Sequence, residues 1–253
     1  MQNDSLPFSL GPSSHRLLKN LALSQNVYVN GEHLARNPDW HVYASAWKAR
    51  HVLRIMRRHQ LSAHTVGEVG CGAGEVLRQL QSNLTRDCIF SGYDISPQAI
   101  ELAKSRENPR LHFKMADIFQ EPDAYFDLLL ILDVVEHVED YFDFLRRLKP
   151  LARDKIFNFP LDLSVQALLR DDGLMMRRRT YGHLHYFTPD LALQSLTDEG
   201  YDVVDWFYAP FGVDFPVGVK GRIMRWPRML LSAISAGFTA RLLGGFSLFV
   251  LAR

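Results

Sequence analysis

The chain has 253 residues, of which 47% are hydrophobic and 23% are charged, and its net charge is +1 at neutral pH. This is the composition of one globular domain with room for additions. The balanced charge argues against nucleic acid as a partner. Two cysteines, Cys71 and Cys88, are too few for a disulfide framework, and no zinc-ligand spacing is present. A reducing, cytoplasmic environment is therefore expected.

The apolar stretches of the chain predict neither a signal peptide nor a membrane span. The N-terminal stretch MQNDSLPFSLGPSSHR lacks a basic segment followed by an apolar run. The most apolar stretch, MLLSAISAGFTA, is shorter than the roughly 20 residues that span a bilayer. Attachment to a membrane surface is kept as an alternative to a purely cytoplasmic protein. The sequence does not indicate an oligomeric state.

Helical and extended patterns alternate along most of the chain. Apolar residues at helical spacing predict a first helix over residues 41–60. The further expected helices are 74–83, 96–107, 138–148 and 188–200. The expected strands are 64–70, 88–94, 111–117, 126–134, 155–160, 201–209 and 246–252. Strands that alternate with helices predict a doubly wound, mostly parallel sheet covered on both faces.

Local signals refine several of these helices. Ser96 and Thr188 are expected N-caps, each followed by a proline at the first helical position. Gly200 is expected to end the helix over 188–200. In the helix over 138–148, the side chains expected to point inward are Val138, Tyr141, Phe142, Leu145 and Leu148.

The domain organisation is inferred from where the alternation of strands and helices begins and where it is interrupted. Residues 1–60 are expected to form an N-terminal arm and a helical cap, and residues 61–253 the main domain. Residues 161–187 and 209–243 interrupt the rhythm and are expected to be insertions. Since ligands of open sheets bind beyond the carboxyl ends of the strands, the insertions are expected to lie over the active face.

A glycine-rich loop follows the first expected strand. In VGEVGCGAGE the spacing is acid-x-Gly-x-Gly-x-Gly, formed by Glu68, Gly70, Gly72 and Gly74. A dinucleotide fingerprint would have glycine at Glu75, and no lysine follows as in a P-loop. Two carboxylates would repel a pyrophosphate, whereas they suit a ligand that carries an ammonium or sulfonium charge.

This loop and four later stretches resemble, in order, the motifs of the class I, Rossmann-like S-adenosylmethionine-dependent methyltransferases. The matching stretches are EVGCGAGE, YDISPQAIELAK, MADIF, DLLLILDVVEHV and GHLHYFTPDLALQSLTDEGY. The fourth has the form seen in ubiquinone-biosynthesis-type small-molecule methyltransferases. The resemblance covers about residues 41–253. It implies a seven-stranded sheet with an antiparallel last strand, S-adenosylmethionine as cofactor and S-adenosylhomocysteine as product.

The resemblance also implies where the cofactor is bound. Asp94 would hold both ribose hydroxyls, Asp117 would meet the adenine amino group, and Ile118 would lie on the adenine ring. Asp133 and Lys48 would lie at the methionine end; the alternative is that Lys48 is a solvated neighbour of a core Trp47. The expected cofactor-binding residues are Lys48, Glu68, Gly70, Cys71, Gly72, Gly74, Asp94, Ile95, Asp117, Ile118 and Asp133.

Three histidines are candidate catalytic residues. His137 follows the fourth motif, and His183 and His185 lie in the segment that faces substrate in relatives. Histidine is suited to accept a proton near neutral pH. Asp133, Glu136 and His137 form a D-x-x-E-H pattern that could ligate a divalent ion. Helix capping by the acids is favoured instead, so no metal is expected.

The expected function is methyl transfer to a small-molecule acceptor, with O-methylation favoured. The alternative is a cofactor-binding protein without transferase activity that serves as a partner module; a nicotinamide dehydrogenase is disfavoured by the glycine spacing. Arg177, Arg178 and Arg179 are either a solvated surface or a site that attracts an anionic acceptor. The amphipathic segment RIMRWPRMLLSAISAGFTARLL is expected to be a lid helix packed on the sheet. A membrane-surface or lipid-linked-substrate role is its alternative.

Overall fold

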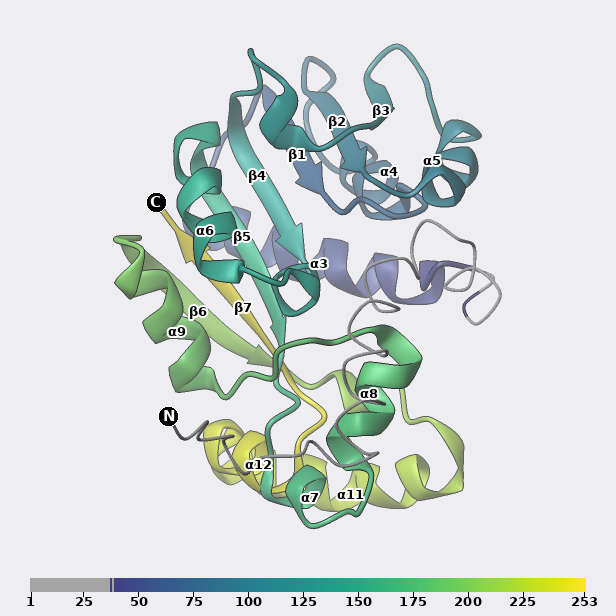
Figure 1. Cartoon of the computed structure of the whole chain (residues 1–253), viewed down its shortest axis with the longest axis vertical. Coiled ribbons are helices and arrows are strands. Elements are labelled where there is room, and N and C mark those ends of the chain that lie inside the picture. The colour runs from purple at the N-terminus through teal and green to yellow at the C-terminus, as the bar shows by residue number, and fades with distance from the viewer. Residues whose placement is uncertain (1–36, 38) are drawn as a thin grey trace, which may run out of the picture.

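A seven-stranded sheet forms the centre of this computed structural model, which describes residue 37 and residues 39–253 (Figure 1). The strands are β1 (Thr65–Val69), β2 (Ile89–Asp94), β3 (Leu111–Met115), β4 (Phe126–Leu132), β5 (Ala152–Pro160), β6 (Val203–Ala209) and β7 (Ser247–Ala252). Their order across the sheet is β3-β2-β1-β4-β5-β7-β6. Strands β1 to β5 pair in parallel, and β7 runs antiparallel to β5 and β6. The predicted Rossmann-like sheet with an antiparallel last strand is confirmed.

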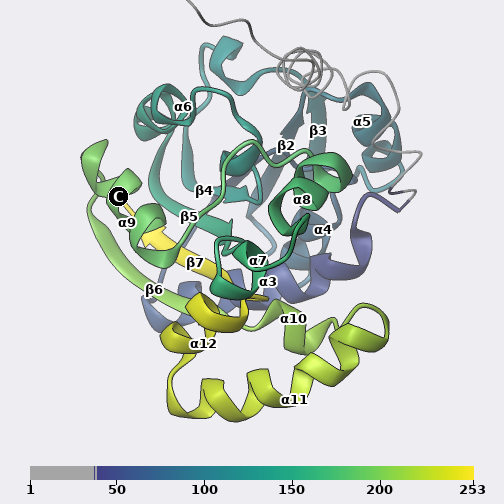
Figure 2. The same cartoon turned by 60° about the horizontal axis from the view of Figure 1, so that its bottom comes forward.

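Helices cover both faces of this sheet (Figures 1 and 2). One face carries α3 (Val42–Arg58), α4 (Glu75–Gln81) and α5 (Pro97–Lys104), and the other carries α6 (Tyr141–Leu148) and α9 (Pro189–Asp198). Short 3-10 helices are η1 (Ile118–Gln120), η2 (Val135–His137) and η3 (Lys149–Leu151). The central strand β4 shows why both faces are covered: Leu128 and Leu130 enter one core cluster and Leu129 and Ile131 the other. An unbroken apolar strand needs an apolar partner on each side.

The predicted helix caps are present. The Ser96 hydroxyl accepts from the backbone nitrogen of Ala99 at 3.4 Å, and the Thr188 hydroxyl accepts from that of Leu191 at 3.2 Å. Gly200 has a φ of +72°, the left-handed conformation that ends many helices. The amino ends of α5 and α9 are therefore fixed by the residues that sequence predicted.

Helix α6 corrects one expected side-chain orientation. It begins at Tyr141, where Asp140 caps it, and not at Val138. Phe142 is 38% exposed, whereas Phe144 is only 9% exposed and packs inward. Because the helix begins at Tyr141, its buried face contains Phe144, Leu145 and Leu148, and Phe142 lies outside that face. The expectation that Phe142 points inward was therefore wrong.

The two interrupting segments lie beyond the carboxyl ends of β5 and β6 (Figure 1). The first holds α7 (Val165–Leu168) and α8 (Gly173–Tyr181), and the second holds α10 (Phe211–Asp214), α11 (Gly218–Ile234) and α12 (Ala236–Leu243). The expected N-terminal arm over residues 1–36 lies outside the described residues. Among the helices of residues 39–253, none combines the length and hydropathy required to cross a membrane.

Candidate active site

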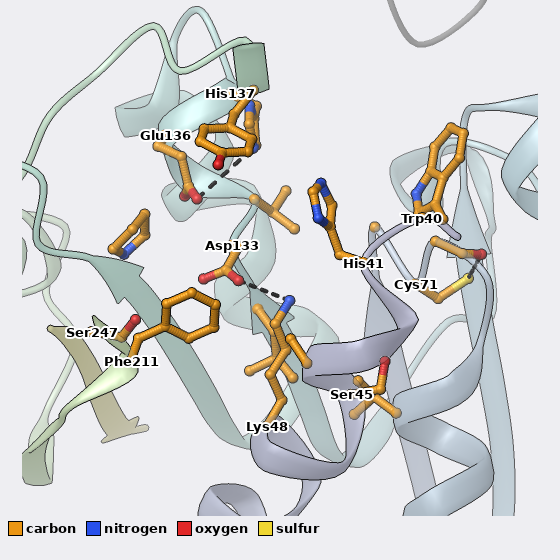
Figure 3. Close-up of a pocket in the computed structure, with 18 of the residues that line it drawn as sticks. Trp40, His41, Ser45, Lys48, Cys71, Asp133, Glu136, His137, Phe211 and Ser247 are labelled. Atoms are coloured by element: carbon orange, nitrogen blue, oxygen red, sulfur yellow. Dashed lines mark hydrogen bonds and ion pairs between the residues drawn. The ribbon is translucent and has the colours of Figure 1, made fainter. Parts of the chain in front are cut away.

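A cavity of about 340 Å³ lies at the carboxyl ends of the parallel strands, beside the glycine loop (Figure 3). It adjoins β1 and β4, where the strand order changes direction, which is the usual ligand position in such sheets. The predicted cofactor-binding residues in its lining are Lys48, Glu68, Gly70, Cys71, Gly72, Asp94, Ile95 and Asp133. The predicted catalytic residues in its lining are His137 and His183. Both insertions contribute to the lining, through Arg177 and Phe211 among others.

The glycine loop has the backbone that its sequence requires. Gly70, Gly72 and Gly74 have φ values of +66°, +54° and +75°, a region that residues with a Cβ rarely adopt. A Cβ on Gly72 would lie 2.5 Å from Cδ1 of Trp40, and one on Gly70 would lie 2.7 Å from Cγ2 of Val134. The loop therefore needs glycine both for its turn and for the close approach of its neighbours.

Asp94 is fixed at the end of β2 by the backbone of both flanking segments. Its Oδ2 accepts from the nitrogen of Gly72 at 2.9 Å, and its Oδ1 accepts from the nitrogen of Ser96 at 2.8 Å. Burial raises the pKa of Asp94, and these two backbone bonds act against that rise. Each carboxylate oxygen can accept a further hydrogen bond. The side chain is thus oriented at the cavity wall with acceptor capacity left for ligand hydroxyls.

Glu68 brings a buried carboxyl group to the end of the cavity beside the glycine loop. The side chain is 3% exposed, and its Oε2 has no hydrogen-bond partner among the described residues. Burial, with the nearby Asp94, raises the pKa of Glu68 to about 8, against the opposing effect of Lys48. An unsatisfied buried acceptor is destabilising until a ligand donor reaches it. This orphaned oxygen fits a ligand with an ammonium group, as S-adenosylmethionine has.

The raised pKa of Glu68 predicts a specific pH dependence of stability. The unfolded chain loses this proton near the ordinary value of 4.5, whereas the folded chain keeps it to about 8. The free energy of unfolding should therefore fall as pH rises from 4.5 to 8, by at most about 5 kcal/mol from this group. Glu68→Gln removes the titration, so denaturant titrations of both proteins should show a flatter pH profile for the variant. Parallel profiles would contradict the assignment.

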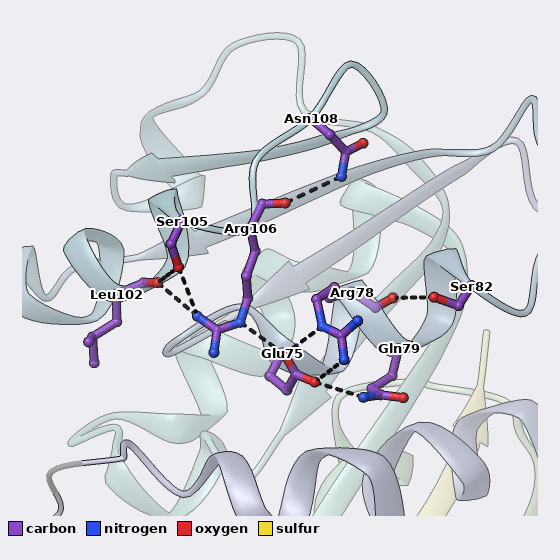
Figure 4. Close-up of polar contacts among 8 residues, drawn as sticks. All are labelled: Glu75, Arg78, Gln79, Ser82, Leu102, Ser105, Arg106 and Asn108. Carbon is purple, nitrogen blue, oxygen red and sulfur yellow. Dashed lines mark hydrogen bonds and ion pairs between the residues drawn. The ribbon is translucent and has the colours of Figure 1, made fainter.

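Glu75 occupies the position where a dinucleotide-binding loop would have glycine. Its carboxylate accepts from Nε of Arg78 at 2.8 Å, from Nε of Arg106 at 2.9 Å and from the amide of Gln79 at 2.7 Å (Figure 4). The hydrogen bonds of Arg78, despite partial burial and together with those of Arg106 and Gln79, lower the pKa of Glu75 to about 2. The expectation that Glu75 repels a pyrophosphate by its charge is thereby weakened, because two guanidinium groups balance that charge. Glu75 instead ties the first turn of α4 to the end of α5.

Lys48 and Asp133, both predicted for the methionine end, contact each other. Nζ of Lys48 on α3 lies 2.8 Å from Oδ2 of Asp133, which follows β4 (Figure 3). The amide of Asn158 also donates to Asp133. Burial lowers the pKa of Lys48, but the charge and hydrogen bond of Asp133 outweigh this and hold it above its ordinary value. This ion pair holds the amino-terminal part of α3 against the end of β4, where α3 forms one wall of the cavity. Trp47 is a core residue, 1% exposed, as the alternative held.

A buried histidine–carboxylate pair lies at the other end of the cavity. Nδ1 of His183 donates to Oδ2 of Asp162 at 2.6 Å, and the guanidinium of Arg177 lies 2.9 Å from Oδ1 of the same residue. The ring of His137 stands edge-on to that of His183, with centroids 4.9 Å apart. A carboxylate bound to Nδ1–H fixes the tautomer in which Nε2 can accept a proton.

Glu136 adds a second buried carboxyl group beside these histidines. It is 0% exposed, and neither carboxyl oxygen has a hydrogen-bond partner among the described residues. Burial first, then the charge of Asp133, raises the pKa of Glu136 well above its ordinary value. One atom each of Glu136, His137 and His183 lie within 4.8 Å of one another. Such a set can share a proton or hold a divalent ion, and the expectation of no metal stays a prediction.

His185 lies apart from the cavity. Its Nε2 is 3.1 Å from the carbonyl oxygen of Glu139, and its ring packs edge-on against Tyr141 at 4.8 Å between centroids. Its backbone nitrogen donates to the carbonyl of Glu136 at 3.1 Å. These contacts hold the segment after α8 against η2, which brings His183 to Glu136. Of the three predicted histidines, two therefore come together and the third supports them from outside.

Three predicted cofactor contacts also lie outside the cavity lining. Asp117 caps η1 by accepting from the nitrogen of Phe119 at 3.0 Å. Ile118 is 2% exposed and belongs to the core. Gly74 forms the N-cap position of α4 behind the loop. The adenine contacts implied by the resemblance thus remain predictions.

Several lining residues were not predicted. Trp40 and His41 stand just before α3 with φ values of 48° and 58°, and both line the cavity. Burial, with the charge of Lys48, lowers the pKa of His41. Asp162 and Tyr181 come from the first insertion. The aromatic cluster at residues 40–43 is the one sequence feature that could have indicated this wall of the cavity.

Comparison with known proteins agrees with this geometry. Residues 68–155 match the family model of a methyltransferase domain. That stretch holds the glycine loop, Asp94 and the D-x-x-E-H pattern. With the strand order and the cavity at its switch point, the match defines the class: residues 68–155 belong to a methyltransferase domain, built on a sheet of Rossmann-like fold.

Solved structures with similar folds include three methyltransferases. Magnesium protoporphyrin IX methyltransferase from Synechocystis PCC 6803, with bound S-adenosylhomocysteine, is 16% identical over 92% of this chain and 98% of its own, with a TM-score of 0.57. The N-methyltransferase NodS from Bradyrhizobium japonicum WM9 is 16% identical over 81% and 85%, at 0.53. The plantazolicin methyltransferase BpumL is 15% identical over 95% and 97%, at 0.56. At these identities the likeness shows the fold alone.

Proposed function

We propose that this enzyme methylates a hydroxyl group of a small aromatic molecule, in the manner of the ubiquinone-biosynthesis-type methyltransferases that its motifs resemble. The observation that supports this most directly is the His183–Asp162 pair, 2.6 Å between Nδ1 and Oδ2, at the cavity end away from Gly72. An amine acceptor is already nucleophilic when neutral, whereas a hydroxyl must lose its proton. A base held in one tautomer is the feature that a hydroxyl acceptor requires.

In this proposal, one end of the cavity binds the cofactor and the other end binds and deprotonates the acceptor. At one end, Gly70, Gly72, Asp94 and Glu68 offer a close backbone approach, hydroxyl acceptors and a partner for an ammonium group. S-adenosylmethionine, bound there, would supply the methyl group. At the other end, His183 accepts the acceptor's proton at Nε2, and Asp162 stabilises the imidazolium that forms.

The shape of the acceptor end supports an aromatic hydroxyl. Phe211, Phe246 and Tyr181 line the cavity with rings that can pack on a flat acceptor and exclude water. A phenolic hydroxyl has a pKa of about 10, close enough to histidine for proton transfer within the complex. In-line transfer then depends chiefly on how these walls align the oxygen with the methyl group.

Isotopic labelling tests the proposal. The protein is incubated with cofactor that carries a deuterated methyl group and with two panels of acceptors, phenols or catechols and primary or secondary amines. Mass spectrometry should find the labelled methyl on oxygen in the first panel, together with S-adenosylhomocysteine. Labelled amines with unlabelled phenols would overturn the choice of oxygen and leave the class of enzyme intact.

A further inference from the structure

Helix α11 presents its apolar side chains to solvent. Val219, Ile223, Trp226, Leu230 and Ile234 follow one another at spacings of four, three, four and four residues, so they share one face of the helix. They are 70%, 64%, 65%, 68% and 85% exposed, in that order, and no side chain of α11 is buried. A surface helix normally turns its apolar stripe to the core. The expectation that this segment packs its apolar face on the sheet was wrong.

A polar anchor on the opposite side fixes the helix in this orientation. Arg228, two residues from both Trp226 and Leu230, points the other way. Its Nε donates to the carbonyl of Gly244 at 3.0 Å and its guanidinium to the carbonyl of Leu243 at 3.1 Å. These bonds attach α11 to the segment that leads into β7. The helix is thus held by an arginine on its inner side while its apolar stripe faces outward.

The charged residues of the C-terminal segment that contains α11 are all basic. Asp214 is the last acidic residue of the sequence, and no aspartate or glutamate occurs from residue 215 to residue 253. On α11 itself, Lys220 and Arg222 flank the apolar stripe, and Arg225 follows one turn later. Contiguous exposed apolar surface with a polar rim marks an interaction site in most proteins. The charged residues that α11 itself places beside the stripe are all basic, so its partner should carry negative charge next to an apolar interior.

We propose that this face of α11, formed by the apolar stripe with Lys220 and Arg222, docks on the surface of an anionic lipid bilayer. A helix that lies in the membrane interface has this design: an apolar face, cations beside it and a tryptophan at headgroup depth. Phe238 on the next helix, α12, is also exposed, at 57%. Figure 2 shows α11 along the outer edge of the molecule, next to α10 and α12 and away from the sheet.

The docking face is connected to the cavity through the anchor of Arg228. Its acceptor Gly244 directly precedes Gly245, Phe246 and Ser247, which line the cavity. Docking therefore turns the insertion side of the cavity toward the lipid. The inference goes beyond the proposed reaction and does not depend on it, because it requires only the surface of α11.

Vesicle binding tests the proposal on the full chain. The protein is sedimented with vesicles of phosphatidylcholine alone and with vesicles that also contain phosphatidylglycerol. We expect partition to the anionic vesicles that falls as salt is raised, because exposed charges are screened. Ile223→Asp combined with Trp226→Asp should abolish it. Lys220→Glu combined with Arg222→Glu should lower the partition coefficient by at least about tenfold.

A matched control lies at the other end of the sheet. Tyr125, just before β4, is an exposed aromatic at 61%, against 65% for Trp226. Tyr125→Asp should leave vesicle binding unchanged. The tryptophan fluorescence emission of the wild type should shift to shorter wavelength when the protein binds anionic vesicles. Trp226→Phe should remove that shift. Every variant should bind S-adenosylhomocysteine as the wild type does in calorimetry, which separates this proposal from that of the reaction.

Three outcomes would overturn the proposal. The first is a wild-type protein that stays in solution with both kinds of vesicle. The second is partition that neither double variant alters. The third is a concentration-dependent dimer, seen by sedimentation velocity, that Ile223→Asp with Trp226→Asp dissolves while vesicle binding is absent; this would assign the face to a second copy of the chain.

Discussion

His183→Ala is expected to lower turnover by about 10²–10⁴, the usual contribution of a positioned general base. The reason is the buried pair of His183 with Asp162 at the cavity wall, which fixes the ring in the tautomer whose Nε2 can accept a proton. Affinity for S-adenosylhomocysteine should be retained, since the change lies away from the glycine loop. The measurements are a turnover assay with a labelled acceptor and calorimetry with the product. Full activity in the variant would remove this histidine from the mechanism.

Two controls sharpen this result. His185→Ala changes a neighbouring histidine that bonds to Glu139 outside the cavity, so its rate should stay close to that of the wild type. Asp162→Asn keeps the shape of the side chain but favours the other tautomer of His183. This variant should therefore also turn over slowly, and its pH–rate profile should be shifted.

Adding a chelator tests the metal alternative. Loss of activity that a divalent ion restores would give Glu136, His137 and His183 the role of ligands.

Gly72→Val is expected to abolish cofactor binding while the chain still folds. The residue has a φ of +54°, and its Cβ would lie 2.5 Å from the ring of Trp40. A branched side chain would therefore strain the loop and fill the space where the ligand must approach. Calorimetry with S-adenosylhomocysteine measures the loss, and circular dichroism checks the fold.

A variant at a second glycine serves as a control, because it tests backbone strain without obstruction of the ligand site. Gly218 has a similar φ of +64°, but a Cβ there meets no atom within 4 Å. Gly218→Val should lower the melting temperature and leave cofactor affinity unchanged. If Gly72→Val bound the product as tightly as Gly218→Val does, the glycine loop would not be the cofactor site.

The sequence predicted the fold well where local pattern decides it. The apolar run of β4, the caps Ser96 and Thr188, and the glycine spacing each follow from interactions within a few residues. The resemblance of the ordered motifs then supplied the seven-stranded sheet with its antiparallel last strand, which no local pattern contains. The inward face of α6 was predicted less well, because a start three residues later at Tyr141 changes which phenylalanine is buried.

The residues that line the cavity were predicted mainly around the glycine loop. Asp162 is 21 residues from His183, and only the path of the first insertion brings the two together. Arg177 looked like part of a solvated run, since nothing near it in sequence shows that its partner is a buried carboxylate. Lys48 and Asp133 were each assigned to the cofactor, but their mutual contact depends on how α3 crosses the end of β4. Such long-range pairs require the tertiary structure.

The bonds of Glu75 have a consequence for the thermodynamics of ligand binding. They join the first turn of α4, which follows the glycine loop, to Arg106 just after α5, so this turn is held in place before any ligand arrives. Binding at a preorganised surface loses little conformational entropy. The proposed acceptor end is built instead from two insertions outside the sheet, with residues such as Arg177 and Phe211. We expect affinity for the cofactor to vary little among variants of the insertions, and acceptor selectivity to vary widely.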